Sequence, residues 1–341
     1  MREARDEEPE LSLNAAVPPE DVTDLVASQI NGDGRASPDG VCVFAPSTIV
    51  TVTIEHGADD EPEVHFHAGG QGFWIARLLG RLGVPTTICT VFGGEAGQVA
   101  STLVQTEPIE IRAVHRQQDN GCWIHDRRTG DRRIVVDVAG GALGRHETDE
   151  LVGATLVAGL RSGICVLTGP HHPGLIDPSR YGRLADDLRT NGVEVIVDLS
   201  EEPLRASLEA GVDFCKVSDE DLLATDRSIS RSPRAALEQL HERGADHAAI
   251  TRAERPALAL IEGEALQVST PRFQVVDHRG AGDAFTALVA ATRYWGLDWH
   301  DAVRWGAAAG ALTVLRRGLA TADRNEIHQL LDRVELQPID R

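Results

Sequence analysis

Stretches of β-branched and alternating hydrophobic residues mark the first part of the chain as strand-rich. Val41–Glu55 predicts a strand that Pro46 breaks or bulges, and Val64–His67 predicts a second, short strand. Trp123–Val138 alternates on either side of a polar turn and predicts a hairpin. We expect strands drawn from about 48–67 and from 123–138 to form a small β-sheet that stands off the main body.

A helix with one hydrophobic face is predicted between these strands. Its apolar residues follow the spacing i, i+3, i+4 and i+7, which keeps them on one side of a 3.6-residue turn. These residues are Ile75, Leu78, Leu79 and Leu82. Gly83 is expected to end the helix, because a glycine followed closely by proline is typical of a helix C-terminus. Thr86–Val91 predicts the strand that comes next.

From about residue 151 the pattern changes to strands that alternate with helices. The predicted strands are Ile164–Thr168, Val193–Asp198, Asp213–Val217 and Ala248–Thr251, followed by a hairpin of Ala257–Ile261 and Ala265–Val268. Helices are predicted at 282–295 and at about 299–315. This alternation predicts an α/β fold with a doubly wound, mainly parallel sheet.

Composition narrows the classes of function. The net charge of −20 repels phosphodiester backbones, so no nucleic-acid partner is expected. Apolar runs are too short to cross a bilayer and the N-terminus lacks a secretory signal, so we expect no membrane partner and a cytoplasmic location. Residues 1–40 are acidic and rich in loop-forming residues, apart from one short helix expected around 19–30. They predict a poorly ordered tail or linker before one domain at 41–335.

The strongest chemical signal is the segment 276–285, where a predicted strand leads through small residues into a helix. Gly280, Ala281 and Gly282 would let the backbone approach an anion, and the free N–H groups of a helix start would point toward it. Asp283 would stand in the first turn, where a carboxylate can accept a proton from a substrate hydroxyl. A lone Asp at a helix start more often only caps the helix, and residues alone leave both roles open.

Two other segments follow strands or precede helices in the same way. Gly69, Gly70 and Gly72 contain a G-x-G pattern, but no acidic residue is placed to hold the ribose of a dinucleotide. The segment 216–221 begins with Lys216, the one lysine of the chain, and continues Val-Ser-Asp-Glu-Asp. Its polar side chains either cap a helix or supply oxygen ligands to Mg²⁺.

Together these segments resemble the signatures of the ribokinase/PfkB family of sugar kinases. Gly-Ala-Gly-Asp at 280–283 is similar to the end of the family's D-T-x-G-A-G-D, with Asp277 at the first Asp. The glycines at 69–72 are similar to G-G-K-G-x-N, with Gln71 in place of the Lys and Trp74 in place of the Asn. The segment 216–221 is similar to K-P-N-x-x-E.

The resemblance implies a ribokinase-like fold with a small β lid, and it implies roles for the matching residues. Asp283 becomes the catalytic base, and the anion hole is formed by Gly280, Ala281 and Gly282. Contacts to ATP fall on Lys216, Ser218 and Thr251, contacts to substrate on Gly69, Gly70, Gln71 and Trp74, and a Mg²⁺ contact on Asp221. The implied cofactors are ATP and Mg²⁺, with room for a monovalent cation. The implied partner is a second copy of the chain in a homodimer, joined through the lid.

The reaction implied is ATP-dependent phosphoryl transfer to a hydroxyl of a sugar, sugar phosphate or related polyol. The motifs are most similar to the phosphosugar, 1-phosphofructokinase-like branch. Ile49 replaces the Asp that grips sugar hydroxyls in that branch, and 117–120 keeps only the Asn of a sugar-phosphate motif. The acceptor is therefore expected to differ from an ordinary fructose phosphate.

Two alternatives remain open. A nucleoside kinase of the same fold would stack a base on Phe73 and Trp74, and a sugar-binding regulator would bind without much turnover. Retention of Asp283 argues against the regulator, since binding alone needs no base.

Two histidine pairs add weaker signals. His65 and His67 share one face of a predicted strand, where metal binding is the less favoured interpretation. His171 and His172 follow a predicted strand at its carboxyl end, where α/β sheets bind ligands, although filling a loop is the simpler interpretation.

Overall fold

The computed structural model describes residues 38–57, 59–130, 132–225, 232–277, 279–315 and 323–339. The predictions for the tail, including the helix around 19–30, concern residues 1–37 and lie outside the described residues. The predicted division into a tail and one domain stays a prediction.

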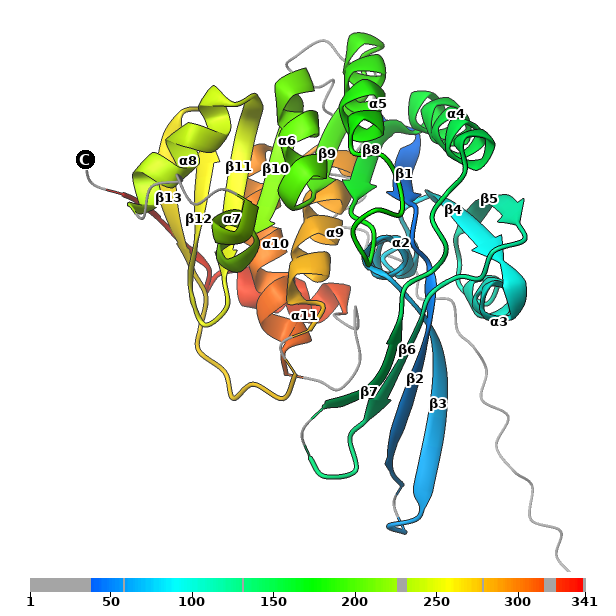
Figure 1. Ribbon diagram of the computed structural model, residues 1–341. Coiled ribbons are helices and arrows are strands. Elements are labelled where there is room, and N and C mark those ends of the chain that lie inside the picture. The colour runs from blue at the N-terminus through cyan, green and yellow to red at the C-terminus, as the bar shows by residue number, and fades with distance from the viewer. Residues whose placement is uncertain are drawn as a thin grey trace, which may run out of the picture.

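A ten-stranded sheet forms the centre of the body (Figure 1), in the order β14-β13-β12-β11-β10-β9-β8-β1-β4-β5. Its strands are β1 Gly40–Ala45, β4 Thr86–Gly93, β5 Glu110–Arg116, β8 Gly163–Thr168, β9 Glu194–Asp198, β10 Val212–Ser218, β11 Ala245–Arg252, β12 Arg255–Ile261, β13 Glu264–Ser269 and β14 Glu335–Pro338. Neighbours from β5 through β11 run parallel, and β12, β13 and β14 are added antiparallel. The mainly parallel sheet predicted from the sequence is confirmed.

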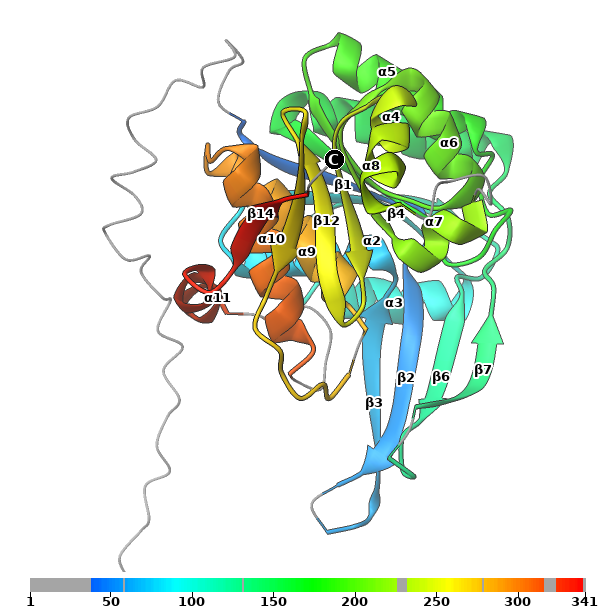
Figure 2. The same cartoon turned by 90° about the vertical axis from the view of Figure 1, so that its left-hand side faces the viewer.

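Helices cover both faces of this sheet, as expected for strands that are buried along their whole length. The helices are α2 Gln71–Arg81, α3 Gly94–Val104, α4 Arg145–Ser162, α5 Ser179–Thr190, α6 Glu201–Ala210, α7 Asp219–Thr225, α8 Pro233–Glu242, α9 Ala281–Tyr294, α10 Trp299–Thr313 and α11 Arg324–Leu331. One core cluster joins α2, α9 and α10 to the sheet, and the other joins α4, α5, α6 and α8 to its opposite face (Figure 2).

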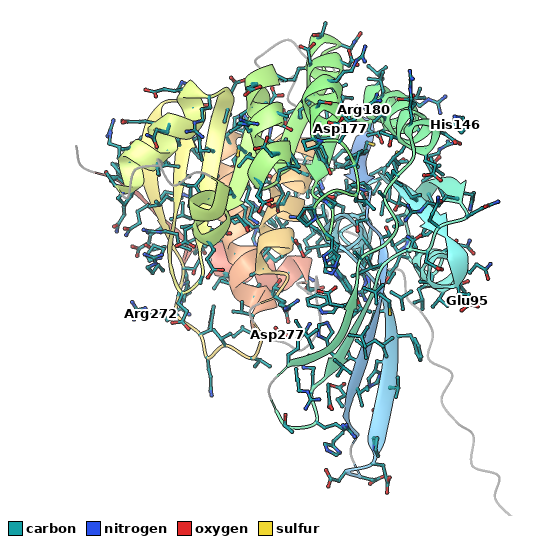
Figure 3. The ribbon with its side chains drawn as sticks, viewed as in Figure 1. Glu95, His146, Asp177, Arg180, Arg272 and Asp277 are labelled. Carbon is teal, nitrogen blue, oxygen red and sulfur yellow. The ribbon has the colours of Figure 1, made fainter. Side chains whose placement is uncertain are left out.

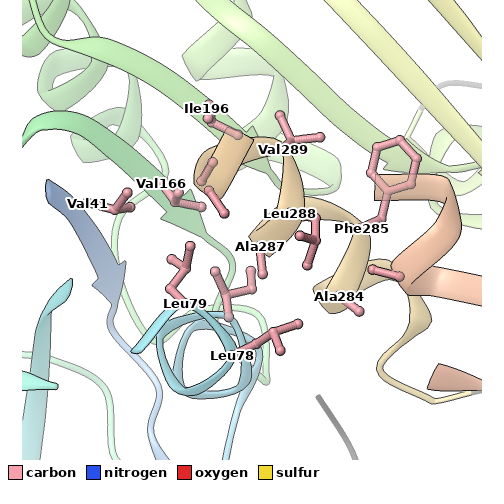
Figure 4. Close-up of a cluster of buried hydrophobic side chains, with 14 of the residues drawn as sticks. Val41, Leu78, Leu79, Val166, Ile196, Ala284, Phe285, Ala287, Leu288 and Val289 are labelled. Atoms are coloured by element: carbon pink, nitrogen blue, oxygen red, sulfur yellow. The ribbon is translucent and has the colours of Figure 1, made fainter. Parts of the chain in front are cut away.

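The core between α2 and α9 fixes the start of α9. Leu78 and Leu79 of α2 lie beside Ala287 and Leu288 of α9 in the first core cluster (Figure 4). All four side chains are almost fully buried. Burial of each large aliphatic side chain contributes about 1.5–3 kcal/mol, so this contact holds the middle of α9 against the body and thereby positions its start.

A separate four-stranded sheet, the lid, projects from the body (Figure 1). It has the order β3-β2-β6-β7 and consists of β2 Ile49–His56, β3 Pro62–Gly69, β6 Cys122–Asp126 and β7 Arg133–Val138. Strands β2 and β6 are parallel, and the outer pairs are antiparallel. The predicted small sheet is confirmed, and the chain leaves the main sheet for the lid at Pro46, which lacks the N–H that a continuing ladder needs.

One sequence prediction needs correction. The residues before Gly280 form a loop rather than a strand: the N–H groups of Val276 and Asp277 both donate to the carbonyl of Val314, at 2.8 and 3.3 Å, beyond the end of α10. Val275 and Val276 favour a strand by their β-branched side chains, but they form none here because no neighbouring strand pairs with them. The main sheet also includes β14, which pairs antiparallel with β13. Within the described ranges, no helix has both the length and the apolar character needed to span a membrane.

Candidate active site

The carboxyl ends of neighbouring strands bring polar side chains to one edge of the main sheet. Asp198 at the end of β9 is in register with Thr168 of β8 on one side and with Lys216 of β10 on the other. One step further along the edge, Ser218 is in register with Thr251 of β11. Parallel pairing places all of these residues at the edge where open α/β sheets bind ligands.

Helix α9 begins at this edge with the small-residue segment predicted to bind an anion. Gly280 is its N-cap and has a φ of 77°, a left-handed conformation that glycine adopts without strain. A Cβ at Gly282 would lie 2.5 Å from Lys216 Nζ, so glycine is needed there to make room for the ammonium group. The first N–H groups of a helix have no partner within it, and here they open beside a cation.

Lys216 and Asp198 form a buried ion pair behind the start of α9. Both residues are 6% exposed or less, and Lys216 Nζ lies 3.1 Å from each carboxylate oxygen of Asp198. Thr286 of α9 donates to the same carboxylate at 2.6 Å. Burial alone would lower the pKa of Lys216, but the carboxylates of Asp198 and Asp283 outweigh it and the pKa lies above the usual value. Lys216 is therefore held as a charged ammonium group.

Asp283 stands in the first turn of α9, next to this pair. Burial raises the pKa of its carboxyl to about 7, the charge of Asp198 adds to the rise, and Lys216 acts against it. A carboxyl group with a pKa near the working pH exchanges protons readily in both directions. The arrangement therefore suits Asp283 for general-base chemistry, beyond the helix-capping role that the sequence left open.

The segment after β10 combines helix capping with acidity. Ser218 Oγ accepts the N–H of Asp221 at 3.0 Å and donates to its carboxylate at 2.6 Å, so the alternative of a helix cap is seen at the start of α7. The charge of Asp221 also contributes to the raised pKa of Lys216. The structure thus joins Ser218 to Asp221 directly, and Lys216 responds to the Asp221 charge.

The turn between β11 and β12 follows Thr251. Ala253 in this turn has a φ of 47°, in the left-handed region that favours glycine. A residue with a Cβ pays about 1–2 kcal/mol to adopt this conformation. The turn thus keeps a backbone shape that glycine favours without the glycine.

The segment predicted to contact substrate begins with residues that shape the backbone at the start of α2. Gly70 is the N-cap of α2 with a φ of 99°, and a Cβ there would lie 2.2 Å from the carbonyl oxygen of Ser47. Gln71 accepts the N–H of Gly169 at 3.0 Å, which ties the start of α2 to the loop after β8. Gly69 ends β3 and is followed directly by this N-cap. These residues lie where lid and body join.

Trp74 and Phe73 do not lie on an open surface. Trp74 is 7% exposed and Phe73 is 3% exposed, and both belong to the core cluster around α2. Arg77 packs over the Trp74 ring at 5.2 Å from its centroid. The alternative in which these two rings stack on a nucleoside base therefore finds no support here, because both rings are packed in the core.

The junction between lid and body carries a group of arginines that the sequence analysis did not single out. Asp277 lies at this junction (Figure 3), where its carboxylate accepts from Arg127 at 3.2 Å and from Arg132 at 2.7 Å. Arg279, one residue before the N-cap of α9, places its guanidinium 4.0 Å from the centroid of the Trp123 ring. Two guanidinium groups thus pair with the Asp277 carboxylate, and the third, that of Arg279, lies over Trp123 just before the N-cap of α9.

Beneath the lid, polar ring atoms lack hydrogen-bond partners. Among the described residues, none pairs with the indole nitrogen of Trp123 or with either ring nitrogen of His125, whose side chain is fully buried. Burial, followed by the charge of Arg132, lowers the pKa of His125 to about 4, so its ring is neutral at physiological pH. Buried polar atoms without partners are uncommon in proteins, so these rings distinguish the junction from an ordinary core.

Asn120, the asparagine retained from the sugar-phosphate motif, is buried and hydrogen-bonds to the backbone of three other residues. Asn120 is 4% exposed, and its amide group donates to the carbonyls of Thr48 and Val91 at 2.6 and 2.8 Å. Its side-chain oxygen accepts the N–H of Gly93 at 2.8 Å. It thus fixes the chain where β4 turns into α3 and where β1 leads to the lid.

Comparison with known proteins identifies the family. A model described as the pfkB family carbohydrate kinase matches residues 43–326. The 1-phosphofructokinase of Haloferax volcanii is 27% identical over 277 residues, which cover 80% of this chain and 87% of that protein.

Solved structures share the fold. Phosphofructokinase-2 from Escherichia coli in complex with potassium matches with a TM-score of 0.77 and 21% identity, over 86% of this chain and 98% of that one. Ribokinase of Arabidopsis thaliana complexed with ribose and ATP matches with a TM-score of 0.67 and 21% identity, over 87% and 99%. The ribokinase-like fold is confirmed. Since the family model covers most of the chain, this protein belongs to the pfkB family of carbohydrate kinases.

Proposed function

We propose that this kinase transfers the γ-phosphoryl group of ATP to a hydroxyl of a phosphorylated sugar, with Asp283 as the base. The observation that carries the proposal is the position of Asp283 in the first turn of α9, with a pKa raised to about 7 and with Lys216 alongside. Family membership supports the reaction class, ATP-dependent phosphorylation of a sugar. The position and the raised pKa of the Asp283 carboxyl support its role as the general base.

The reaction follows from these groups. The acceptor hydroxyl gives its proton to the Asp283 carboxylate as its oxygen forms a bond to the γ-phosphorus. The bond from that phosphorus to the β–γ bridging oxygen breaks, and ADP leaves with the electron pair. The N–H groups of Gly280, Ala281 and Gly282 stabilise the charge on the transferring group, and the Lys216 ammonium adds a fixed positive charge.

Mg²⁺ fits the acidic start of α7. Asp221 offers carboxylate oxygen, the donor that Mg²⁺ prefers, close to Lys216. When bound with ATP, the ion neutralises phosphate charge. We propose that Asp221 holds it through water, because Ser218 already donates to this carboxylate. The E. coli phosphofructokinase-2 structure contains potassium, and comparing K⁺ with Na⁺ as assay salts would test a monovalent cation here.

The arginines at the lid junction favour a phosphorylated acceptor. Arg127, Arg132 and Arg279 bring three positive charges, and Asp277 offsets one of them. Guanidinium groups bind phosphate by paired hydrogen bonds, so this junction can hold a second phosphate away from the nucleotide. The similar proteins named phosphofructokinases agree with this choice.

Matched acceptor pairs test the proposal. ATP turnover should be measured with fructose, tagatose and ribose, with their 1- and 6- or 5-phosphates, and with nucleosides. We expect kcat/KM to be at least about tenfold higher for a phosphorylated sugar than for its parent, as one charge-assisted contact contributes about 1.5–3 kcal/mol. Binding of sugars without turnover in the whole panel would instead support the sugar-binding regulator.

We also propose that the kinase is a homodimer joined through the lid. One face of the lid is apolar: Phe66, Val52, Ile124 and Val136 form one row across its four strands. On this face Val64, Phe66, Val136 and Val138 are 37–56% exposed. Trp123 and Asp137 lie on the other face, which meets the body. Large exposed apolar patches are typical of protein interfaces, and a second copy of the same face is a self-complementary occupant.

A further inference from the structure

Three side chains with metal-ligand chemistry converge where the lid meets the body, at a distance in sequence from the catalytic motifs. Asp137 lies on β7 of the lid, and His171 and His172 lie in the loop after β8. His171 Nε2 lies 3.2 Å and His172 Nε2 lies 2.8 Å from the same oxygen, Asp137 Oδ1. Within the described part of the chain, this is the group of three such residues whose ligand atoms all lie within 4.8 Å of one another.

We propose that Asp137, His171 and His172 bind a divalent transition-metal ion of the Zn²⁺ class, which ties the lid to the body. Two imidazoles and one carboxylate form a donor set typical of zinc, with the fourth position left for water or a ligand. Tetrahedral bonds of about 2.0–2.1 Å place ligand atoms roughly 3.3 Å apart. The two nitrogens are already 3.2 and 2.8 Å from the carboxylate oxygen, so only a small outward movement admits the ion.

The surroundings hold the two rings in place. Pro170 and Pro173 flank the histidines, and proline fixes its backbone φ and so stiffens this loop. The His171 ring lies 5.2 Å from the Trp123 ring and 4.5 Å from the His172 ring. The side chains of His171 and His172 are 20% and 33% exposed, which leaves the group open to an ion from solvent.

The chemistry separates this group from the Mg²⁺ that accompanies ATP. Imidazole nitrogen suits zinc, nickel and copper, whereas Mg²⁺ demands oxygen ligands in an octahedral arrangement. Two ring contacts also connect this group to the start of α9. His171 packs on Trp123, and Trp123 carries Arg279, which directly precedes the N-cap of α9. An ion held between β7 and the β8 loop therefore restrains the lid next to the acceptor.

Binding of the metal alone tests the proposal without reference to turnover. The full chain, freed of metal by a chelator and kept in excess MgCl₂, is titrated with ZnCl₂ by calorimetry. CoCl₂ gives a visible spectrum that reports coordination. We expect one equivalent to bind, with the absorption of tetrahedral Co²⁺. The double variant His171→Ala/His172→Ala should weaken Zn²⁺ binding at least about 100-fold, and Asp137→Asn at least about tenfold.

The matched control is the other histidine pair of the lid. His65→Ala/His67→Ala removes two rings that lie 6.3 Å apart on β3, and it should leave Zn²⁺ affinity unchanged. Unaltered affinity in His171→Ala/His172→Ala, or an equal loss in the control, overturns the site.

Hydrogen exchange tests whether the ion connects the lid to the body. Zn²⁺ should slow exchange in β7 and in residues 169–174 together, and protection of only one of these segments overturns the link between lid and body.

Discussion

Lys216 Nζ lies 3.1 Å from both carboxylate oxygens of Asp198, in a pair that the fold buries beside the proposed anion hole. The pair is a product of strand register, because the two residues stand opposite each other on β10 and β9. It supplies a fixed positive charge beside Gly282, where the first turn of α9 opens.

This pair predicts a non-additive effect on stability. Lys216→Met leaves the Asp198 charge buried without its partner, which costs about 3–5 kcal/mol. The double variant Lys216→Met/Asp198→Asn removes that charge, so it should be more stable than Lys216→Met alone, as measured by urea unfolding. Additive losses would show that the two residues act independently. Both variants should lose turnover, since each removes the ammonium group beside the transferring phosphoryl group.

Asp283→Asn should lower kcat by about 10²–10⁴-fold, the usual contribution of a general base. Asn keeps the size of the side chain but cannot take the proton of the attacking hydroxyl. ATP affinity should change little, because the anion hole is made of backbone N–H groups. The matched control is Asp301→Asn, which changes a first-turn carboxylate of the neighbouring helix α10. Near-normal turnover in Asp283→Asn would remove Asp283 from the chemistry.

The raised pKa of Asp283 predicts two opposite pH effects. The carboxylate is the active form, so kcat/KM should fall as pH drops below about 7, toward a tenfold loss per pH unit. Stability should move the other way: a pKa raised by folding means that the native state binds more protons, so stability falls as pH rises from about 4 through 7. Asp283→Asn should therefore be at least as stable as wild type at pH 8, with the difference shrinking at pH 4. Thermal unfolding at both pH values provides the measurement.

The sequence predicted what depends on local pattern, and it missed what depends on pairing between distant segments. Asp283 was found because small residues, a helix start and an acidic side chain stand in one short run. Asp198 was not found because its role arises only when β9 and β10 pair, although its place at the end of a predicted strand was a usable signal. Trp74 was assigned to substrate from its motif position. Its spacing of four residues from Leu78 already predicted the same buried helix face.

Other misses have similar causes. The strand expected before Gly280 does not form, because Val276 meets the end of α10 and no neighbouring strand. The partners of Asp277 were hidden because Arg127 and Arg132 are about 150 residues away in the chain and reach it only through the lid. The apolar and polar faces of the lid were implied by alternation in each strand, but their orientation depends on contacts with the body.

Ala253→Gly should stabilise the protein by roughly 1 kcal/mol. Ala253 is held at a φ of 47°, and relief of about 1–2 kcal/mol of left-handed strain exceeds the added chain entropy of glycine in the unfolded state. The exposed side chain loses little packing. The change is read from the midpoint of urea unfolding. Gly263 has a φ of 81° in the turn between β12 and β13, so Gly263→Ala is the converse control and should destabilise. A loss of stability in Ala253→Gly would contradict the strain argument.

Val64→Glu should convert the proposed dimer to a monomer. Val64 is on the apolar face of the lid and is 52% exposed, and a charge placed there would be buried without a partner in a lid-to-lid interface. Val157 on α4 has the same 52% exposure and lies outside the lid, so Val157→Glu is matched in chemistry and exposure.

Light scattering of wild type and both variants at one concentration measures the mass. We expect a mass of two chains for wild type and for Val157→Glu, and a mass of one chain for Val64→Glu. Thermal unfolding should show that both variants are folded. A monomeric wild type would refute the dimer. If Val157→Glu alone dissociated the dimer, the interface would lie over α4 instead of over the lid.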